Sequence, residues 1–91
     1  MKIKLNDSFL KQVRTLPKNI QKRTIEIIEK CKEAQTLAEI QNRKTLYSKK
    51  NRNYFRIRIG DYRIGIQVIE DELVFQYVGV RDDFYKAYPP K

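Results

Sequence analysis

Histidine and tryptophan are absent from the 91 residues, and cysteine occurs once, as Cys31. Without histidine the chain can form neither a Ser-His-Asp triad nor an imidazole general base, and the commonest metal ligand is missing. A single cysteine cannot close an internal disulfide, which is typical of proteins from a reducing compartment. We therefore expect a cytoplasmic protein in which Cys31 is a small buried hydrophobe and not a nucleophile.

Several other functional signals are missing as well. The three glycines lie far apart and form no phosphate-binding loop. No apolar run approaches the roughly 18 residues of a membrane span, and the first residues do not resemble a signal peptide. Three consecutive acids at 70–72 fit an exposed turn better than a metal cluster. The sequence therefore predicts no membrane segment, no metal and no cofactor.

Positive charge is what the chain has in excess. Twenty lysines and arginines against eleven acids give a formal net charge of +9. Charge of this size predicts attraction to nucleic acid, to an anionic membrane or to an acidic protein. It is concentrated in residues 43–63, where eight basic residues accompany one acid, Asp61. A solvated lysine-rich face explains part of this excess, but it does not explain arginines that alternate with core residues.

Hydrophobic spacing predicts one α+β domain over residues 1–91. The pattern indicates a short strand, two helices, three strands and a short terminal helix, over residues 1–5, 9–16, 20–31, 54–59, 62–69, 73–80 and 82–88. The predicted order is β-α-α-β-β-β(-α), with a two-helix hairpin packed on one face of a mainly antiparallel sheet. Between these elements, residues 36–40 are expected to extend helically and residues 48–53 to form a polar basic loop.

The hairpin over residues 54–69 carries the most informative pattern. Successive side chains of a strand point to opposite faces. One face of the first strand therefore carries Phe55, Ile57 and Ile59, and the other carries Tyr54, Arg56 and Arg58. Such a sheet packs on one side and offers guanidinium groups to a polyanion on the other.

The last strand contains a conflict. Gln76 shares the parity of three valines that the core is expected to bury. Either Gln76 is hydrogen-bonded at a sheet edge, or a β-bulge shifts the register near it. We favour the assignment that places Tyr77 and Arg81 beside the arginines of the hairpin.

These residue types suit cleavage of RNA by its own 2′-hydroxyl. That reaction needs an aligned hydroxyl, stabilised charge on the phosphate oxygens and proton transfer. Arginine provides fixed contacts to phosphate, and preorganised charge is often the largest catalytic contribution. Tyrosine rings stack on bases, which contributes roughly 1–3 kcal/mol per base. Arginine stays protonated and is a poor base, whereas Tyr85 close to several arginines ionises more easily.

Three segments resemble the RelE/ParE superfamily of toxins from type II toxin–antitoxin systems: residues 54–64, 77–81 and 83–86. The resemblance extends over nearly the whole chain and implies a RelE-like fold of the microbial-RNase type. The RelE branch implies an endoribonuclease, an mRNA interferase that cleaves mRNA in the ribosomal A site and inhibits translation. The superfamily also implies a cognate antitoxin, which the charge of +9 predicts to be acidic.

The resemblance assigns roles to particular residues. The predicted catalytic set comprises Arg56, Arg58, Arg63, Arg81 and Tyr85. The first two stand where the RelE branch has functional lysines, the next two match its phosphate-binding and strand-ending arginines, and Tyr85 matches its C-terminal tyrosine. Because arginine keeps its proton, the lysine base of that branch has no equivalent, which leaves Asp82 or Asp83 as a speculative substitute.

Further RNA contacts are predicted at basic side chains and one aromatic ring: Lys44, Lys49, Lys50, Arg52 and Tyr77. Two other interpretations stay open at this point. One is a ParE-like inhibitor of DNA gyrase without nuclease activity. The other is a catalytically inert relic that only binds antitoxin or RNA.

Overall fold

The computed structural model describes residues 1–46 and 53–90. The elements in chain order are β1 (Lys2–Leu5), α1 (Asp7–Arg14), α2 (Lys18–Glu33), the 3-10 helix η1 (Leu37–Glu39), β2 (Arg43–Leu46), β3 (Tyr54–Ile59), β4 (Tyr62–Ile69), β5 (Glu72–Val80) and α3 (Arg81–Ala87). The predicted helical hairpin, the three long strands and the short terminal helix are confirmed. The α+β class is confirmed with them.

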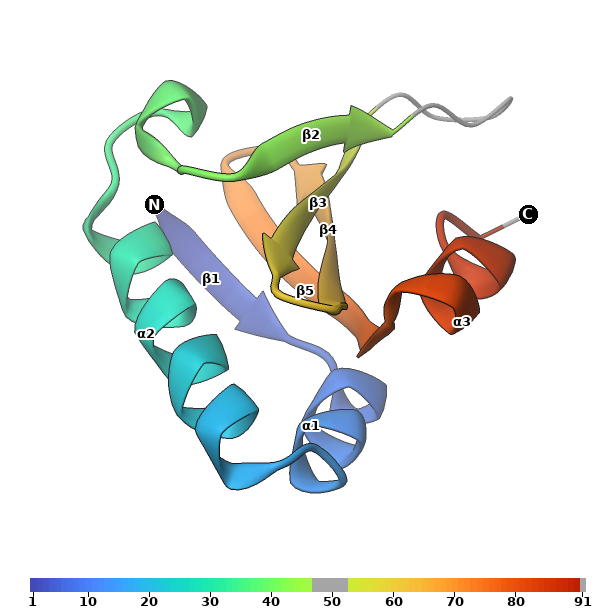
Figure 1. Cartoon of the computed structure of the whole chain (residues 1–91). Helices are drawn as coiled ribbons and strands as arrows, with labels where there is room; N and C mark the ends of the chain where they lie inside the picture. Colours follow the sequence, from blue (N-terminus) through green and yellow to red (C-terminus); the bar gives the residue numbers. More distant parts are fainter. Residues whose placement is uncertain (47–52, 91) are drawn as a thin grey trace.

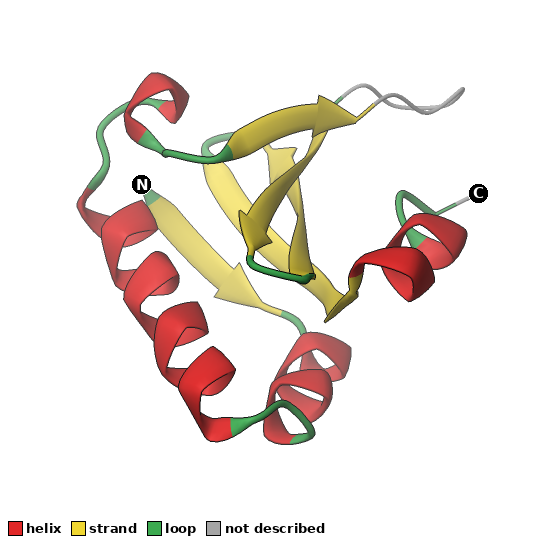
Figure 2. Cartoon of the chain, in the orientation of Figure 1, coloured by secondary structure: helices red, strands yellow, loops and turns green. Residues whose placement is uncertain are grey.

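The strands form one mixed sheet in the order β1-β5-β4-β3-β2. β1 pairs with β5 in parallel, and the other neighbours are antiparallel. Helices α1 and α2 cover one face of the sheet, and α3 follows β5 at the opposite side of the molecule (Figures 1 and 2). None of the described helices is long and apolar enough to cross a membrane.

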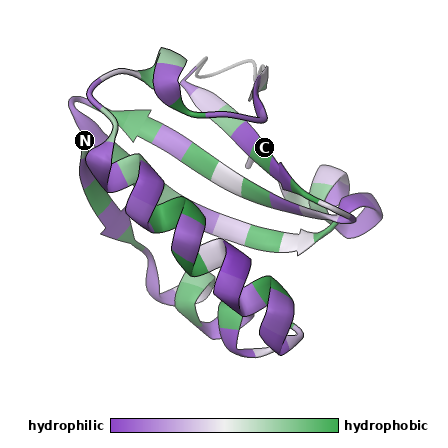
Figure 3. Cartoon of the chain, turned by 60° about the vertical axis from the view of Figure 1, so that its left-hand side comes forward, coloured by the Kyte–Doolittle hydropathy of each residue, from purple (hydrophilic) through white to green (hydrophobic). Residues whose placement is uncertain are grey.

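The core lies between the helical hairpin and the sheet. Phe55, Ile57 and Ile59 are buried in it, while Arg58 between them is exposed. Phe9 of α1 and Ile28 of α2 pack into the same cluster. The alternation of hydrophilic and hydrophobic residues along the strands is visible in Figure 3. The period of two therefore assigns the strand faces correctly in the central hairpin.

The segment between α2 and the hairpin differs from its prediction. The helical structure expected over residues 36–40 is present only as η1, a 3-10 helix that is separate from α2 and is closed by a capping box between Thr36 and Glu39. The chain then enters β2, an edge strand that the sequence did not reveal, so the sheet has one strand more than predicted. β2 has four residues, of which only Leu46 is strongly apolar. Such a short segment cannot show the alternation of polar and apolar residues by which a strand is recognised in a sequence. The predicted basic loop lies outside the described residues except for Asn53.

A β-bulge resolves the conflict at Gln76. The pairing of β4 with β5 shifts between Gly65 and Ile66, so that Gly65 faces Tyr77 but Ile66 faces Phe75. Gln76 is the extra residue, and it leaves the core face and hydrogen-bonds with Gln67 of β4. The bulge alternative is therefore correct. β5 is an inner strand, so the sheet-edge alternative is wrong.

Candidate active site

The polar face of the central hairpin gathers the predicted arginines. Arg58 of β3 lies directly opposite Arg63 of β4 in the strand register, and Arg56 lies opposite Gly65. The three side chains therefore project from the face of the sheet that α1 and α2 leave uncovered. Within the described residues the sole ion pair joins Lys32 to Glu29, both on α2. No carboxylate of the described chain neutralises these guanidinium groups.

Arg63 is fixed by the turn that precedes it. Its Nη1 donates to the carbonyl oxygens of Gly60 and Tyr62, at 2.7 and 2.9 Å. Gly60 has a positive φ of 55°, which glycine adopts without strain and which suits this turn. Arg63 is only 7% exposed, and its Nε is buried without a hydrogen-bond partner. An unpaired buried donor is costly to a fold.

Arg56 connects the sheet to α3. Its Nε donates to the hydroxyl oxygen of Tyr85 at 3.1 Å, and its Nη1 donates to the carbonyl oxygen of Asn42 at 3.4 Å. Tyr85 itself is 47% exposed, so its hydroxyl stands at the surface beside the guanidinium group. Residues 29 positions apart in the chain are therefore brought into direct contact.

The arginines change the acidity of Tyr85. Partial burial acts to raise the pKa of this phenol. Hydrogen bonds with Arg56 and Arg63, together with their positive charges, outweigh that effect and bring the pKa below the usual value of a tyrosine. Because nearby cations stabilise the phenolate, Tyr85 is the group of this face best suited to accept a proton.

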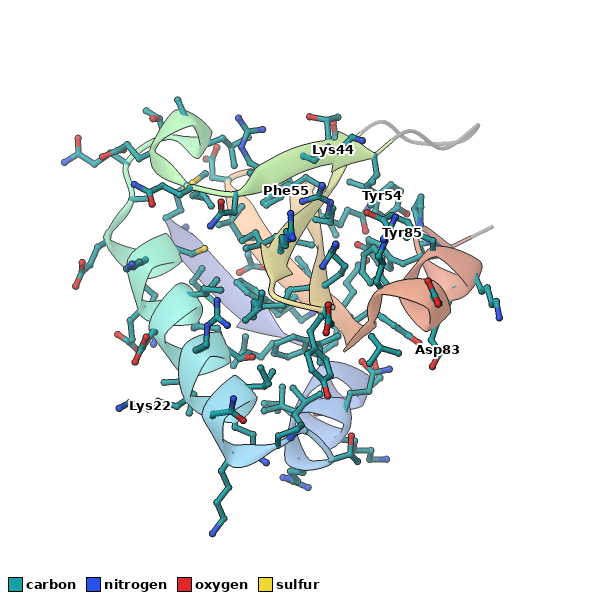
Figure 4. The ribbon with its side chains drawn as sticks, in the orientation of Figure 1. Lys22, Lys44, Tyr54, Phe55, Asp83 and Tyr85 are labelled. Carbon is teal, nitrogen blue, oxygen red and sulfur yellow. The ribbon has the colours of Figure 1, made fainter. Side chains whose placement is uncertain are left out.

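Arg81 and Lys44 meet the central hairpin through their backbones at two different points. Arg81 is the first residue of α3; its side chain is exposed, and its backbone N–H donates to the carbonyl oxygen of Asp61 at 2.8 Å. The backbone of Arg81 is therefore bound to the same turn that accepts the hydrogen bonds of Arg63. Lys44 of β2 lies opposite Arg56 in the register. Figure 4 shows Lys44, Tyr54 and Tyr85 between β2 and α3, with Lys22 at the far side of the molecule.

The position of α3 depends on Tyr88, a residue that the sequence analysis missed. Its ring is 3% exposed and lies on Gly65, where an added Cβ would come within 2.6 Å of a ring carbon. Phe84 and Tyr54 contact the same ring, with centroids at 5.3 and 5.5 Å. A glycine in the middle of a strand often marks a close approach of this kind, and that signal was available at Gly65.

The structure gives less information on the other residues that were predicted to contact RNA. Tyr77 is half-buried under α3, where its ring packs against Phe84 and Tyr88 at centroid distances of 5.8 and 6.3 Å. Its role in RNA binding therefore stays a prediction. The other predicted contacts, at Lys49, Lys50 and Arg52, lie outside the described residues.

The two acids that begin α3 differ in position. Residues two apart on a helix point about 200° apart, so Asp83 is directed away from Tyr85, as Figure 4 shows. Asp82, three residues before Tyr85, shares its side of the helix, and it is exposed. The described residues contain no group of three histidine, cysteine or acidic side chains placed to hold a metal ion.

Cys31 belongs to the opposite face of the sheet. It borders a cavity of about 400 Å3 between α2, η1 and Ile57 of β3. Burial raises the pKa of the thiol to about 11, which the nearby N-terminal ammonium group only partly offsets. A thiol of this kind is protonated at neutral pH, so the structure confirms Cys31 as a buried hydrophobe.

Comparison with known proteins gives consistent results. A family model described as the ParE toxin of the type II toxin–antitoxin system parDE matches residues 3–83. Toxin RelE3 of Methanocaldococcus jannaschii is 37% identical over 92 residues, which cover 98% of this chain and 100% of that protein. The toxin in the crystal structure of a RelB-RelE antitoxin-toxin complex from Methanococcus jannaschii superimposes with a TM-score of 0.74. The two chains are 34% identical, and the match covers 94% of this chain and 99% of the other. The isolated RelE toxin of E. coli has a TM-score of 0.65 at 18% identity, over 93% and 90% of the two chains, and so shares the fold.

Proposed function

The chain belongs to the RelE/ParE superfamily of toxins from type II toxin–antitoxin systems. From its similarity to RelE toxins we propose that it is a ribosome-dependent mRNA endoribonuclease. The proposed substrate is mRNA in the ribosomal A site, and the consequence of cleavage is arrest of translation. The observation that carries the proposal is the contact between Arg56 and Tyr85 beside the buried Arg63. This contact joins a phosphate-binding group to a group that can accept a proton.

The proposed reaction is attack of the RNA 2′-oxygen on the adjacent phosphorus. The Tyr85 phenolate accepts the proton of the 2′-hydroxyl, the new bond from O2′ to phosphorus forms, and the bond from phosphorus to O5′ breaks. O5′ leaves with a proton taken from water. The products are a 2′,3′-cyclic phosphate and a 5′-hydroxyl end. A single residue that orients and deprotonates the nucleophile is sufficient because the substrate supplies the nucleophile itself.

The arginines have separate roles in this proposal. The guanidinium group of Arg63, fixed by its hydrogen bonds to the turn, provides positive charge beside the phosphate. Arg56 and Arg81 stabilise the charge that develops on the phosphate oxygens. Arg58 positions the scissile nucleotide. Lys44 extends the same face toward the neighbouring phosphate, because it lies opposite Arg56.

The proposed partner is an acidic antitoxin protein. The 34% identical toxin of Methanococcus jannaschii was solved in a complex with the antitoxin RelB. A chain of net charge +9 with an open basic face is neutralised most directly by a segment rich in aspartate and glutamate.

A second candidate function is inhibition of DNA gyrase, favoured by the match to a family model that carries the ParE name. Basic charge suits both targets, so it does not separate them. Induction in cells does. Protein synthesis is followed by incorporation of labelled amino acid, and DNA supercoiling is followed in a reporter plasmid.

The proposal expects protein synthesis to fall first, with supercoiling unchanged at that time. A change in supercoiling that precedes any fall in protein synthesis contradicts it and supports the gyrase alternative. If neither changes while the folded protein accumulates, the chain is an inert relic.

A further inference from the structure

A chain of side-chain hydrogen bonds crosses the site face between α3 and β4. The hydroxyl of Tyr88 donates to Oε1 of Gln76 at 2.8 Å, and Nε2 of Gln76 donates to Oε1 of Gln67 at 2.9 Å. The β-bulge makes this possible, because it turns Gln76 out of the core and toward Gln67. Neither the phosphate contacts nor the proton transfer proposed above uses these groups.

The chain has a fixed direction. The Tyr88 hydroxyl donates to Oε1 of Gln76, which leaves the NH2 group of Gln76 to donate to Gln67. The donor orients the amide of Gln76, and Gln76 in turn occupies the carbonyl oxygen of Gln67. The group left over is the NH2 of Gln67, which has two donor hydrogens and makes no hydrogen bond to a described residue.

This NH2 group is open to a ligand. Within the described residues, the buried side-chain polar atoms without a partner are Nε of Arg43 and Nε of Arg63. Nε2 of Gln67 is not one of them, and it donates to no described residue. It is therefore a partly accessible donor on a half-buried residue, and the part-buried hydrogen bonds with Gln76 and Tyr88 set its orientation.

The neighbour of Gln67 on the site face is Tyr54. The two residues lie directly opposite each other on β4 and β3. The Tyr54 ring is half-buried and meets the Tyr88 ring edge to face, so its position is fixed as well. Arg56 follows Tyr54 on the same face at about 7 Å along the strand. A nucleotide next to the one held at Arg56 is thus placed to stack on Tyr54 and to present its edge to Gln67.

We propose that Tyr54 and Gln67 form a nucleobase subsite that selects guanine and uracil, which carry a keto oxygen at purine position 6 or pyrimidine position 4, over adenine and cytosine, which carry an amino group at that position. Gln67 offers the base its NH2 group, a hydrogen-bond donor, while its carbonyl oxygen is bonded to Gln76. Guanine presents O6 and uracil presents O4 as acceptors, whereas adenine and cytosine present NH2 groups that would face another donor. Aromatic stacking combined with hydrogen bonds to the base edge is the usual way in which proteins read single-stranded RNA. The inference rests on the proposed function in one respect, that the ligand is RNA.

Uracil and cytosine provide the sharpest comparison, because the two pyrimidines differ at position 4 in oxygen against NH2. The probes are 2′-O-methylated tetramers of uridine and of cytidine, which lack the nucleophilic hydroxyl and cannot be cleaved by the proposed route. Binding to the full-length protein is followed by NMR, through the backbone amides and the side-chain NH2 of Gln67. We expect about fivefold tighter binding of the uridine tetramer, the worth of one hydrogen bond in water. The NH2 resonances of Gln67 should shift with uridine and not with cytidine.

Two variants test the assignment to this chain. Gln67→Leu should bring the ratio of the two affinities to about one, while the affinity for the cytidine tetramer stays within about twofold. Tyr88→Phe keeps the ring on Gly65 but removes the donor that orients Gln76, and it should lower the ratio in the same way. The matched control is Gln35→Leu, an exposed glutamine after α2, which should leave the ratio unchanged.

Equal affinities in the unaltered protein, a preference for cytidine, a ratio that survives Gln67→Leu, or no binding of either tetramer would each overturn the subsite. These results are separable from the fate of the nuclease proposal. A protein that distinguishes uridine from cytidine but cuts no mRNA keeps the subsite and loses the nuclease. One that cuts mRNA without regard to uridine or cytidine keeps the nuclease and loses the subsite.

Discussion

At the scale of single residues, the site is unusual in relying on arginine for every central positive charge. Arginine binds phosphate through a rigid fork, but it holds its proton at any physiological pH. The proposed mechanism therefore needs another residue for proton transfer, and we assign that role to Tyr85 because the neighbouring arginines lower its pKa. In this proposal the arginines bind phosphate and Tyr85 transfers the proton, a division that follows from the side chains present.

The exposed Arg81 gives the cleanest test of charge stabilisation. Replacement by alanine removes a guanidinium group but no described side-chain contact, so the fold should persist. Loss of one preorganised charge typically lowers a rate by about 100-fold or more. We expect that loss in mRNA cleavage, measured by primer extension on a translated message. Lys22→Ala, an exposed change on α2 far from the site, should cleave normally. Full activity of Arg81→Ala would remove this arginine from the mechanism.

The pH dependence of cleavage tests Tyr85. A base must be deprotonated to act, so the rate should rise with pH and level off near the pKa of Tyr85. Since the arginines lower that pKa, levelling should occur below the value of about 10 that is typical of tyrosine. Arg56→Ala removes a hydrogen bond and a positive charge, and so should move the profile to higher pH.

The profile is measured with an uncapped model message in a purified translation system, over the range in which ribosomes stay intact. Tyr85→Phe keeps the ring and loses the ionisable oxygen, so its residual cleavage should not depend on pH in this way. A profile that is identical in Tyr85→Phe and in the unaltered protein would exclude Tyr85 as the base.

At the scale of elements, the contact between α3 and the sheet decides where Tyr85 stands. Tyr88 anchors the helix by lying on Gly65, and Tyr85 is one turn earlier on the same helix. Gly65→Ala should therefore force the Tyr88 ring away, because an added Cβ would meet three of its ring atoms at 2.6 to 2.8 Å. Overpacking of this kind costs about 1–3 kcal/mol.

We expect Gly65→Ala to lower both the free energy of unfolding, measured in urea, and the cleavage rate. Gly79→Ala is the matched control: its added Cβ would approach the Tyr77 ring at 3.2 Å, so its effect on stability should be smaller. If the free energy of unfolding and the cleavage rate of Gly65→Ala equal those of the unaltered protein, α3 is positioned by other contacts.

The sequence predicted elements where one period dominates. The strict alternation around Arg56 and Arg58 assigned both faces of β3, and helical spacing located α2. β2 was not predicted, because its four residues of mixed polarity show no distinct period. The bulge at Gln76 was one of two open alternatives, since only the pairing with β4 shows which residue is extra. The place of Tyr88 depends on a contact between residues 23 positions apart, which no local pattern encodes.

At the scale of the whole molecule, the charge of +9 governs association. An open basic face attracts both RNA and an acidic antitoxin, so the two are expected to compete. Coulombic attraction between exposed charges weakens as salt shortens the screening length from about 10 Å at 0.1 M to about 3 Å at 1 M. The affinity for the antitoxin, measured by calorimetry on the purified pair, should therefore fall over this range of salt. An affinity that does not change would show that the complex is held by apolar contacts.

If the arginines and Tyr85 act together on one RNA phosphate, the chemistry of the cleaved ends should show it. The ends of cellular mRNA are mapped after induction, with and without a block of translation initiation, by a method that distinguishes 5′-hydroxyl from 5′-phosphate termini. We expect new 5′-hydroxyl ends within translated reading frames, and we expect them to disappear when initiation is blocked. New ends that carry a 5′-phosphate, or arrested growth without new ends, would contradict it.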